Sequence, residues 1–141
     1  MSFVLDASVA LLWLVPDTNP AGVAYASAVL RTLKESQALV PSIWPLEVAN
    51  VIAKIEAKNI ATEADSQRFI ALLRRLDIVT DPVTVERALG DTLNLARRYR
   101  LSAYDAAYLE LALRASQPLA TLDAGLAKAA TLAGIPAFSH I

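Results

Sequence analysis

The sequence M-S-F-V-L-D-A-S-V-A-L-L-W-L (residues 1–14) joins a short apolar run to a helical pattern through one aspartate. The apolar run at residues 3–5 predicts a buried strand that ends at Asp6, and the spacing that follows predicts a helix over residues 8–14. A strand so short and continuously apolar is typical of a parallel sheet that helices cover on both faces. This opening therefore indicates an α/β fold.

The same alternation of short apolar runs and longer helical stretches continues along the chain. It predicts further helices over residues 21–35, 44–58, 62–76, 83–99, 103–115 and 125–133. It predicts further strands over residues 39–40, 78–79 and 119–122, a turn over residues 16–20, and an edge strand over residues 135–138, which contains Pro136. Thr62, three residues before Asp65, predicts a capping box. The expected architecture is a short central parallel sheet between two layers of helices.

Composition bounds the size and the setting of the protein. Its 141 residues suit a single domain, residues 1–141, and a hydrophobic fraction of 55% allows a large core. The absence of cysteine excludes disulfides, thiolate metal sites and cysteine nucleophiles. The first residues lack a signal-peptide pattern, and the longest apolar run is too short for a membrane helix. We therefore expect a soluble, cytoplasmic protein with no membrane partner.

The net charge of −1 limits how the chain can bind nucleic acid. Proteins that bind nucleic acid by general charge neutralisation are usually basic overall. Any phosphate binding must therefore be local, or must depend on a bound metal ion.

Acidic residues occupy the places where a parallel sheet meets its ligands. Asp6 and Asp123 follow predicted strands, while Glu47 and Asp105 open predicted helices, and all four positions belong to the carboxyl edge of the sheet. Each residue alone has a local explanation: Asp6 and Asp123 as helix N-caps, Glu47 as a favourable charge in a first turn, and Asp105 in a capping box with Ser102. Those explanations do not predict that the four carboxylates converge.

Converging carboxylates require a counter-charge. Without one they repel each other and their pKa values rise, whereas a divalent cation relieves the repulsion. Ligation by oxygen alone selects hard ions such as Mg²⁺ or Mn²⁺. Such ions support phosphodiester hydrolysis because they acidify a bound water and stabilise the attacking and leaving oxygens. No histidine base is then needed, and we interpret His140, in the C-terminal tail, as incidental.

At this point four motifs carry a family resemblance. The segments V-L-D-A-S-V, L-E-V-A-N, L-S-A-Y-D-A-A-Y-L-E-L-A and L-A-T-L-D together resemble a PIN domain and, more narrowly, the VapC-like toxins of toxin–antitoxin pairs. The third segment is the most specific. The resemblance implies a three-layer PIN-like sandwich and a Mg²⁺- or Mn²⁺-dependent endoribonuclease that acts on RNA. It also implies a homodimer inhibited by a cognate antitoxin.

The resemblance also assigns roles to individual residues. Asp6, Glu47, Asp105 and Asp123 match the family's catalytic and metal-binding acidic quartet. Within it, Asp6 and Asp105 are expected to ligate metal directly, and Glu47 and Asp123 to bind a second ion or hold metal-bound water. Ser8 and Thr121 are expected to orient the metal ligands without binding the metal themselves.

Several further residues have a functional and a structural reading. Asn50 lies one helical turn beyond Glu47 and either contacts substrate or is a surface amide. Tyr104 and Tyr108 either stack on bases or pack in the core. A basic cluster either contacts RNA phosphates or stabilises a helix C-terminus, and it consists of Arg97, Arg98 and Arg100. The tryptophans Trp13 and Trp44 are expected in core packing or in a subunit contact.

Two alternative functions remain open at this stage. One is a PIN-like binding or regulatory module that has lost catalysis, although all four acidic positions are filled. The other is a haloacid dehalogenase-like phosphatase, which requires a second acidic residue two positions after the first. This chain has Ser8 there, and Ala124 stands where a late acidic pair would continue from Asp123.

Overall fold

A parallel sheet lies at the centre of the fold in the computed structural model, which describes residues 1–15 and 18–139. Within these residues the sheet has four strands in the order β3-β2-β1-β4, all parallel. Val4 pairs with Leu39 on one side and with Leu119 on the other, so β1 is an inner strand. The strands are β1 (Ser2–Leu5), β2 (Gln37–Val40), β3 (Ile78–Thr80) and β4 (Leu119–Ala120).

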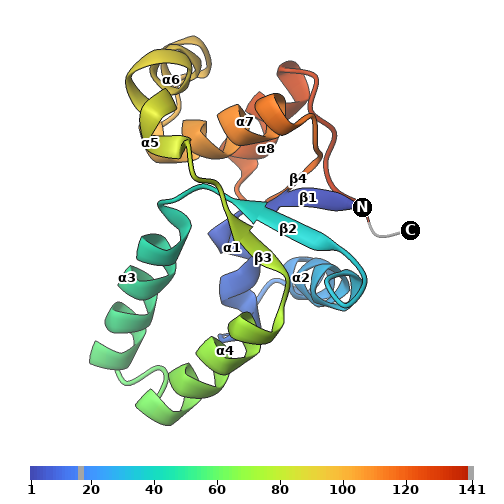
Figure 1. Ribbon diagram of the computed structural model, residues 1–141. Helices are drawn as coiled ribbons and strands as arrows, with labels where there is room; N and C mark the ends of the chain where they lie inside the picture. The colour runs from blue at the N-terminus through green and yellow to red at the C-terminus, as the bar shows by residue number, and fades with distance from the viewer. Residues whose placement is uncertain (16–17, 140–141) are drawn as a thin grey trace.

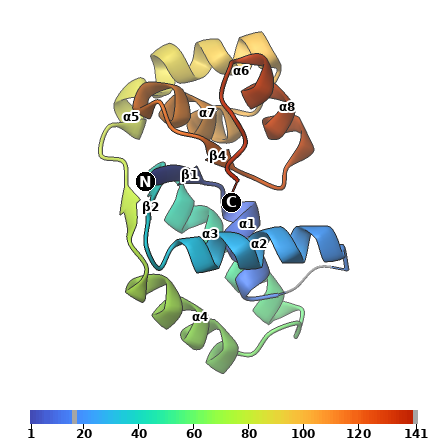
Figure 2. The ribbon, with the colours of Figure 1, turned by 90° about the vertical axis from the view of Figure 1, so that its right-hand side faces the viewer.

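Helices cover both faces of this sheet. In two views at right angles, α1 to α4 lie below the sheet and α5 to α8 above it (Figure 1 and Figure 2). This arrangement confirms the expected three-layer α/β sandwich. The helices are α1 (Ala7–Ala10), α2 (Pro20–Thr32), α3 (Trp44–Ala57), α4 (Glu63–Arg75), α5 (Thr84–Arg87), α6 (Leu93–Tyr99), α7 (Ala103–Ala115) and α8 (Ala124–Leu132).

The core forms around β1, because an inner strand between two helical layers has no face left for water. Phe3, Val4 and Leu5 have no exposed surface. Phe138 stacks on Phe3 with their ring centroids 4.0 Å apart, which holds the segment after α8 against the sheet. On the upper layer, Tyr108 of α7 is also fully buried. These contacts fix the position of the carboxyl end of β1.

The capping box predicted at the start of α4 is confirmed. The Asp65 N–H donates to Thr62 Oγ1 at 3.1 Å, and the Thr62 N–H donates to the Asp65 carboxylate at 2.9 Å. Two otherwise unpaired backbone donors are satisfied in this way. Among the described residues, no helix is long and apolar enough to cross a lipid bilayer.

The prediction of one continuous helix over residues 83–99 is wrong. Between α5 and α6 the chain forms a π-helical turn, η2 (Ala88–Thr92), in which Gly90 adopts φ −113° and ψ −105°. Glycine adopts this non-helical conformation readily because it has no Cβ. The helix predicted over residues 8–14 is also divided, since α1 continues as a 3₁₀ turn, η1 (Leu11–Trp13).

The strand predictions near the C-terminus are too long. The predicted strand at residues 119–122 ends after Ala120, because the Thr121 hydroxyl bonds to Asp6 and to the Asp123 N–H and turns the chain out of the sheet. Residues 135–138 form a single parallel bridge, Leu119 with Ala137, instead of a full edge strand. Pro136 has no N–H to offer, which limits the pairing. Pro16 and Asp17 of the predicted turn, and His140, lie outside the described residues.

Candidate active site

Four acidic side chains surround the carboxyl edge of β1 and β4, and we call this set the acidic rim: Asp6, Glu47, Asp105 and Asp123. Asp6 directly follows β1, and its N–H donates to the carbonyl of Ala120 at the end of β4 at 2.9 Å. Glu47 lies in the first turn of α3 and Asp105 in the first turn of α7. Asp123 is the N-cap of α8.

Asp6 is held by two hydroxyl groups. The Ser8 Oγ and the Thr121 Oγ1 each donate to Asp6 Oδ2 at 2.7 Å. We call these three residues the hydroxyl clasp. The same hydroxyls accept backbone N–H groups, Ser8 from Leu122 and Thr121 from Asp123, each at 3.0 Å. The clasp therefore joins the end of β1 to the loop after β4.

The clasp bears on the capping explanation of Asp6. Although Asp6 occupies the N-cap position of α1, its side chain makes no capping bond in the described structure. The residue is only 6% exposed, and its carboxyl group bonds within the clasp instead. A simple capping role does not account for a buried carboxylate placed this way.

Glu47 is held from α7. The hydroxyl of Tyr108 donates to Glu47 Oε1, and the Tyr108 side chain is fully buried. Base stacking by Tyr108 is therefore excluded, and the residue instead fixes an acidic side chain of the rim. Its position three residues after Asp105, on the same face of α7, was the only sequence signal for this contact. Tyr104 is 64% exposed and remains accessible.

The other two carboxylates differ in their local bonds. The Asp123 Oδ2 accepts the Leu126 N–H at 2.8 Å, so the capping explanation for Asp123 is confirmed. At the start of α7 the Asp105 N–H donates to Ser102 Oγ at 3.1 Å, but among the described residues the reciprocal bond seen at Thr62 and Asp65 is not formed. The Asp105 carboxylate therefore does not complete a capping box, although the Ser102 hydroxyl interacts with it and lowers its pKa.

The four acidic groups share one electrostatic field. Burial raises the pKa of Asp6 above its ordinary value, the Ser8 and Thr121 hydroxyls oppose this, and the charge of Asp123 adds to it. Burial likewise raises the pKa of Glu47, with contributions from Asp6 and Asp105. Burial raises the pKa of Asp105, with contributions from Asp123 and Asp6. These contributions couple Asp6, Glu47, Asp105 and Asp123, which come from distant parts of the sequence.

The rim leaves acceptor oxygens available. Asp6 Oδ2, Glu47 Oε1 and Asp123 Oδ2 each accept a bond from the protein, while within the described structure their second oxygens have no side-chain donor. Carboxylates held through one oxygen and open at the other are suited to bind a hard cation. Among residues 1–15 and 18–139, however, no three acidic or histidine side chains are close enough to enclose an ion by themselves.

Asp81 provides an internal comparison that the sequence analysis missed. It follows β3 as Asp6 follows β1, yet Arg114 binds its carboxylate through two bonds of 2.6 and 3.0 Å. Burial alone would raise the pKa of Asp81, but the bonds from Arg114 and Thr84 outweigh it and lower the pKa. Arg114 also binds Glu110. The spacing of Glu110 and Arg114, four apart on α7, was the available signal.

The structure places the remaining predicted residues as follows. Asn50 is exposed on α3, one turn beyond Glu47. Arg97 bonds to Asn94 Oδ1 at 3.4 Å, whereas Arg98 and Arg100 line a pocket beside α8. The tryptophans serve packing: Trp13 Nε1 donates to the Ala26 carbonyl, and Trp44 is buried in the core.

Solved structures of other proteins share this fold. PAE2754 from Pyrobaculum aerophilum aligns with a TM-score of 0.64 and 21% identity, over 92% of this chain and 79% of that chain. FitAcB from Neisseria gonorrhoeae aligns with a TM-score of 0.61 and 22% identity, over 99% of this chain and 98% of that chain. VapBC2 from Rickettsia felis, in a structure bound to a DNA fragment from its promoter, gives a TM-score of 0.60 and 16% identity, over 87% of this chain and 88% of that chain.

Comparisons of the sequence itself give the family. A comparison with curated proteins found no significant match. The family model described as PIN domain matches residues 3–132, a span that includes the whole acidic rim and the hydroxyl clasp. The chain belongs to the PIN domain family.

Proposed function

We propose that the chain is a divalent-metal-dependent endoribonuclease that hydrolyses RNA phosphodiester bonds. The observation that carries this proposal is the construction of the rim. Asp6 is buried, Glu47 and Asp105 are half-buried, their charges and that of Asp123 repel each other, and hydroxyl groups of the chain hold one oxygen of Asp6 and one of Glu47. Purely structural acids would be expected to find a cationic partner, as Asp81 does in Arg114.

The donor set of the rim fits a magnesium or manganese ion. Asp6 and Asp105 would ligate it directly, and Glu47 and Asp123 would bind a second ion or hold metal-bound water. Mg²⁺ usually keeps several waters and is bound through one or two carboxylates together with substrate phosphate. A rim without a compact three-carboxylate cluster among the described residues is consistent with that mode of binding.

The chemistry divides between the ion and the chain. When bound, a divalent ion lowers the pKa of a water and stabilises charge on the phosphate. The chain supplies orientation: Ser8 and Thr121 fix the Asp6 carboxylate, and Tyr108 fixes that of Glu47. Ligands fixed in this way need little reorganisation when ion and substrate arrive.

We further propose that the chain is the VapC-like toxin of a toxin–antitoxin pair, with a cognate antitoxin and a homodimeric state. The resemblance of its four motifs and the fold likeness to VapBC2 and FitAcB support the first part. Exposed apolar side chains on α5 and the turn after it, Val85 at 76% and Leu89 at 89%, support self-association. Sedimentation at micromolar concentration tests the dimer, and a cytoplasmic location stays a prediction.

RNA cleavage with and without Mn²⁺ tests the enzymatic proposal. We expect structured RNA to be cut by the purified protein, and cleavage to be lost with EDTA and in Asp6→Asn. Asp77→Asn is a matched control, because Asp77 is an exposed acid at the amino end of β3, away from the rim. RNA that stays intact under every condition would overturn the proposal in favour of a PIN-like module without catalysis.

A further inference from the structure

A basic pocket lies between the end of α6 and one face of α8, next to the acidic rim. Its volume is about 350 Å³, and its polar lining consists of Arg98, Arg100 and Lys128 with the ring of Tyr99. Figure 2 shows α6 and α8 side by side in the upper layer, in agreement with this lining. Lys128 was not among the residues that the sequence singled out.

The cations of this pocket are not neutralised by the protein. Its described lining residues include no acidic side chain. In the described part of the chain, none of Arg98, Arg100 and Lys128 forms an ion pair. All three side chains are exposed, so an anion from solution can reach them, and a group of like charges attracts such an anion.

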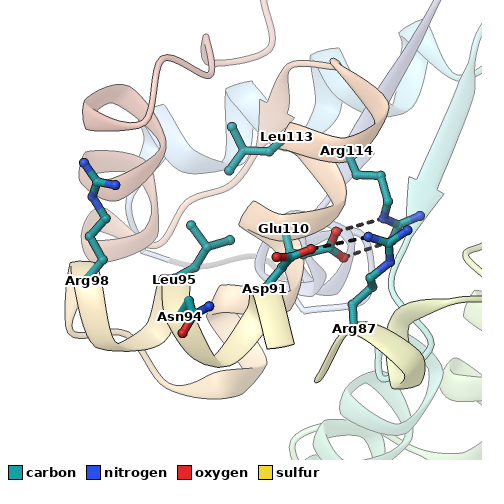
Figure 3. Close-up of a pocket in the computed structure, with 8 residues that line it drawn as sticks. All are labelled: Arg87, Asp91, Asn94, Leu95, Arg98, Glu110, Leu113 and Arg114. Carbon is teal, nitrogen blue, oxygen red and sulfur yellow. Dashed lines mark hydrogen bonds and ion pairs between the residues drawn. The ribbon is translucent and has the colours of Figure 1, made fainter. Parts of the chain in front are cut away.

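The neighbouring pocket shows the opposite arrangement. It measures about 460 Å³ and shares Arg98, but its other arginines are paired: Arg114 with Glu110 at 2.8 Å and Arg87 with Asp91 at 3.3 Å. Figure 3 shows these pairs grouped at one end, with Arg98 at the other. Arg87 and Arg114 of the neighbouring pocket therefore form salt bridges that belong to the fold. The cations of the basic pocket form no ion pair within the described part of the chain.

The basic pocket lies beside Asp123 and includes a residue close in sequence to Asp105. A Cβ placed on Gly125, which lines the pocket, would lie 3.4 Å from Asp123 Oδ2. Leu101, on the other wall, directly precedes the Ser102 cap that holds the start of α7, one turn from Asp105. An RNA chain with one phosphate at the rim would therefore have the basic pocket next to it.

Local backbone geometry places the cations there. Arg100 ends α6 in the left-handed conformation, with φ 54° and ψ 47°, and the Leu101 N–H closes the turn on the Ala96 carbonyl at 3.0 Å. A non-glycine residue in this conformation costs about 1 kcal/mol. With the turn in this conformation, Arg98 and Arg100 line the same pocket as Lys128.

We infer that the basic pocket binds the phosphodiester backbone of the RNA strand beside the cleavage site. This inference rests on the proposed ribonuclease function and adds the path of the strand, from the rim across the turn before α7 towards α8. A chain with net charge −1 cannot hold RNA by general attraction, so its cations must act where the strand lies. Arginine offers several donors to phosphate and lysine a compact charge, and the Tyr99 ring adds an apolar surface.

The test measures binding separately from cleavage. In an Asp6→Asn background, fluorescence anisotropy follows the binding of a short fluorescein-labelled oligouridylate over a range of salt concentrations. Arg98→Gln, Arg100→Gln and Lys128→Gln are each expected to weaken binding several-fold. Each is also expected to reduce the slope of log K against log salt by about 0.7 for every phosphate that the variant no longer neutralises.

Matched controls remove the same charge at the opposite edge of the sheet. Lys34→Gln and Arg75→Gln alter exposed residues near the amino ends of the strands and are expected to leave affinity and slope unchanged. Thermal unfolding followed by circular dichroism checks that each variant folds. Since Arg100 is in a strained turn, the Arg98→Gln Lys128→Gln double variant keeps the test decisive if Arg100→Gln unfolds.

Parallel cleavage assays separate the two possible failures. If the otherwise unmodified protein cleaves RNA but the pocket variants bind as tightly as the controls, the inference is overturned and the proposed function stands. If the protein neither binds nor cleaves RNA, both are overturned. Weakened binding in the pocket variants alone supports the inference.

Discussion

The buried hydroxyl of Tyr108 donates a hydrogen bond to Glu47 Oε1 across 61 positions of the sequence. The bond joins α7 of the upper layer to α3 of the lower layer, directly beside β1. Asp105 lies one turn earlier on α7, so a single helix both carries one acidic residue of the rim and orients another. The relative position of the two helical layers therefore sets the geometry of the rim.

Tyr108→Phe tests this relationship. The hydrogen bond lowers the pKa of Glu47, so its loss raises that pKa further and moves the acidic limb of the pH–activity profile to higher pH. Removing a group that orients a metal ligand typically lowers activity by about 10–100-fold, so we expect a fall of at least about tenfold at neutral pH. Tyr104→Phe, on the exposed first turn of the same helix, is the control. An unshifted profile in Tyr108→Phe would contradict this role.

Asp6→Asn is expected to stabilise the protein while abolishing activity. Because burial and the charge of Asp123 raise the pKa of Asp6, ionising it costs folding free energy. This cost grows as pH rises from the ordinary aspartate pKa through the raised one, and persists at neutral pH. The Asn oxygen still accepts both hydroxyls of the clasp. We expect a gain on the order of 1 kcal/mol, or about 4 °C in Tm, measured by thermal unfolding without divalent ions.

The control is the pH dependence of the difference in stability between Asp6→Asn and the unaltered protein. As pH falls below the ordinary aspartate value, Asp6 is protonated in both folded and unfolded chains, so the stabilities of the two proteins should converge. A variant that is less stable than the original protein at neutral pH would show that the buried carboxylate is not repelled there.

Divalent ions are expected to stabilise the unaltered protein. An ion that binds the folded chain alone adds RT ln(1 + [L]/Kd), about 2.7 kcal/mol at a concentration of 100 Kd. Mn²⁺ should therefore raise Tm, and EDTA should reverse the change. Asp105→Asn should lose most of the increase, whereas Asp77→Asn should keep it. An equal increase in all three proteins would indicate binding away from the rim.

Loss of Arg114 is expected to damage the fold. Arg114 compensates two carboxylates with little exposure, since the Asp81 side chain is 6% exposed and that of Glu110 is 5% exposed. Removing one partner of a buried pair costs about 3–5 kcal/mol, so Arg114→Met should lower the free energy of unfolding by roughly that amount. Chemical denaturation measures it. Arg87→Met is the control, because the Arg87 pair with Asp91 is exposed and contributes at most about 1 kcal/mol.

The pKa of Asp81, which pairs with Arg114, is shifted in the opposite direction to that of Asp6, so its contribution to stability changes with pH in the opposite direction. The pKa of Asp81 is lowered in the folded protein, so its contribution is complete above the ordinary aspartate value and is lost as pH falls through the lowered one. The difference between the unaltered protein and Arg114→Met should therefore persist at neutral pH and shrink only in strong acid. A difference that vanished near neutrality would exclude Asp81 as the partner that matters.

Much of the architecture could be predicted because it depends on local pattern. The strand before Asp6, the helices starting near Trp44 and Ala103, and the capping box of Thr62 follow from periodicity and from hydrogen bonds within a few residues. The interruption at Gly90 was missed because a glycine inside an apolar repeat does not reveal whether the chain bends there.

The contacts that shape the site depend on tertiary structure, so they were harder to predict from the sequence. An aromatic residue at helical spacing predicts burial, which is correct for Tyr108, but not which carboxylate its hydroxyl contacts. Likewise the pattern of a strand followed by aspartate applies equally to Asp6 and to Asp81. What distinguishes them is the position of Arg114 in three dimensions, which gives Asp81 a cationic partner, whereas the described bonds to the Asp6 side chain come from hydroxyls.

The hydroxyl clasp has a consequence for synthesis of the protein. Asp6 is synthesised 115 positions before Thr121, the residue that completes its surroundings. The surroundings of the Asp6 carboxylate therefore stay incomplete while these 115 positions are being translated. Any activity of the rim that depends on the clasp can therefore begin only after Thr121 has been synthesised.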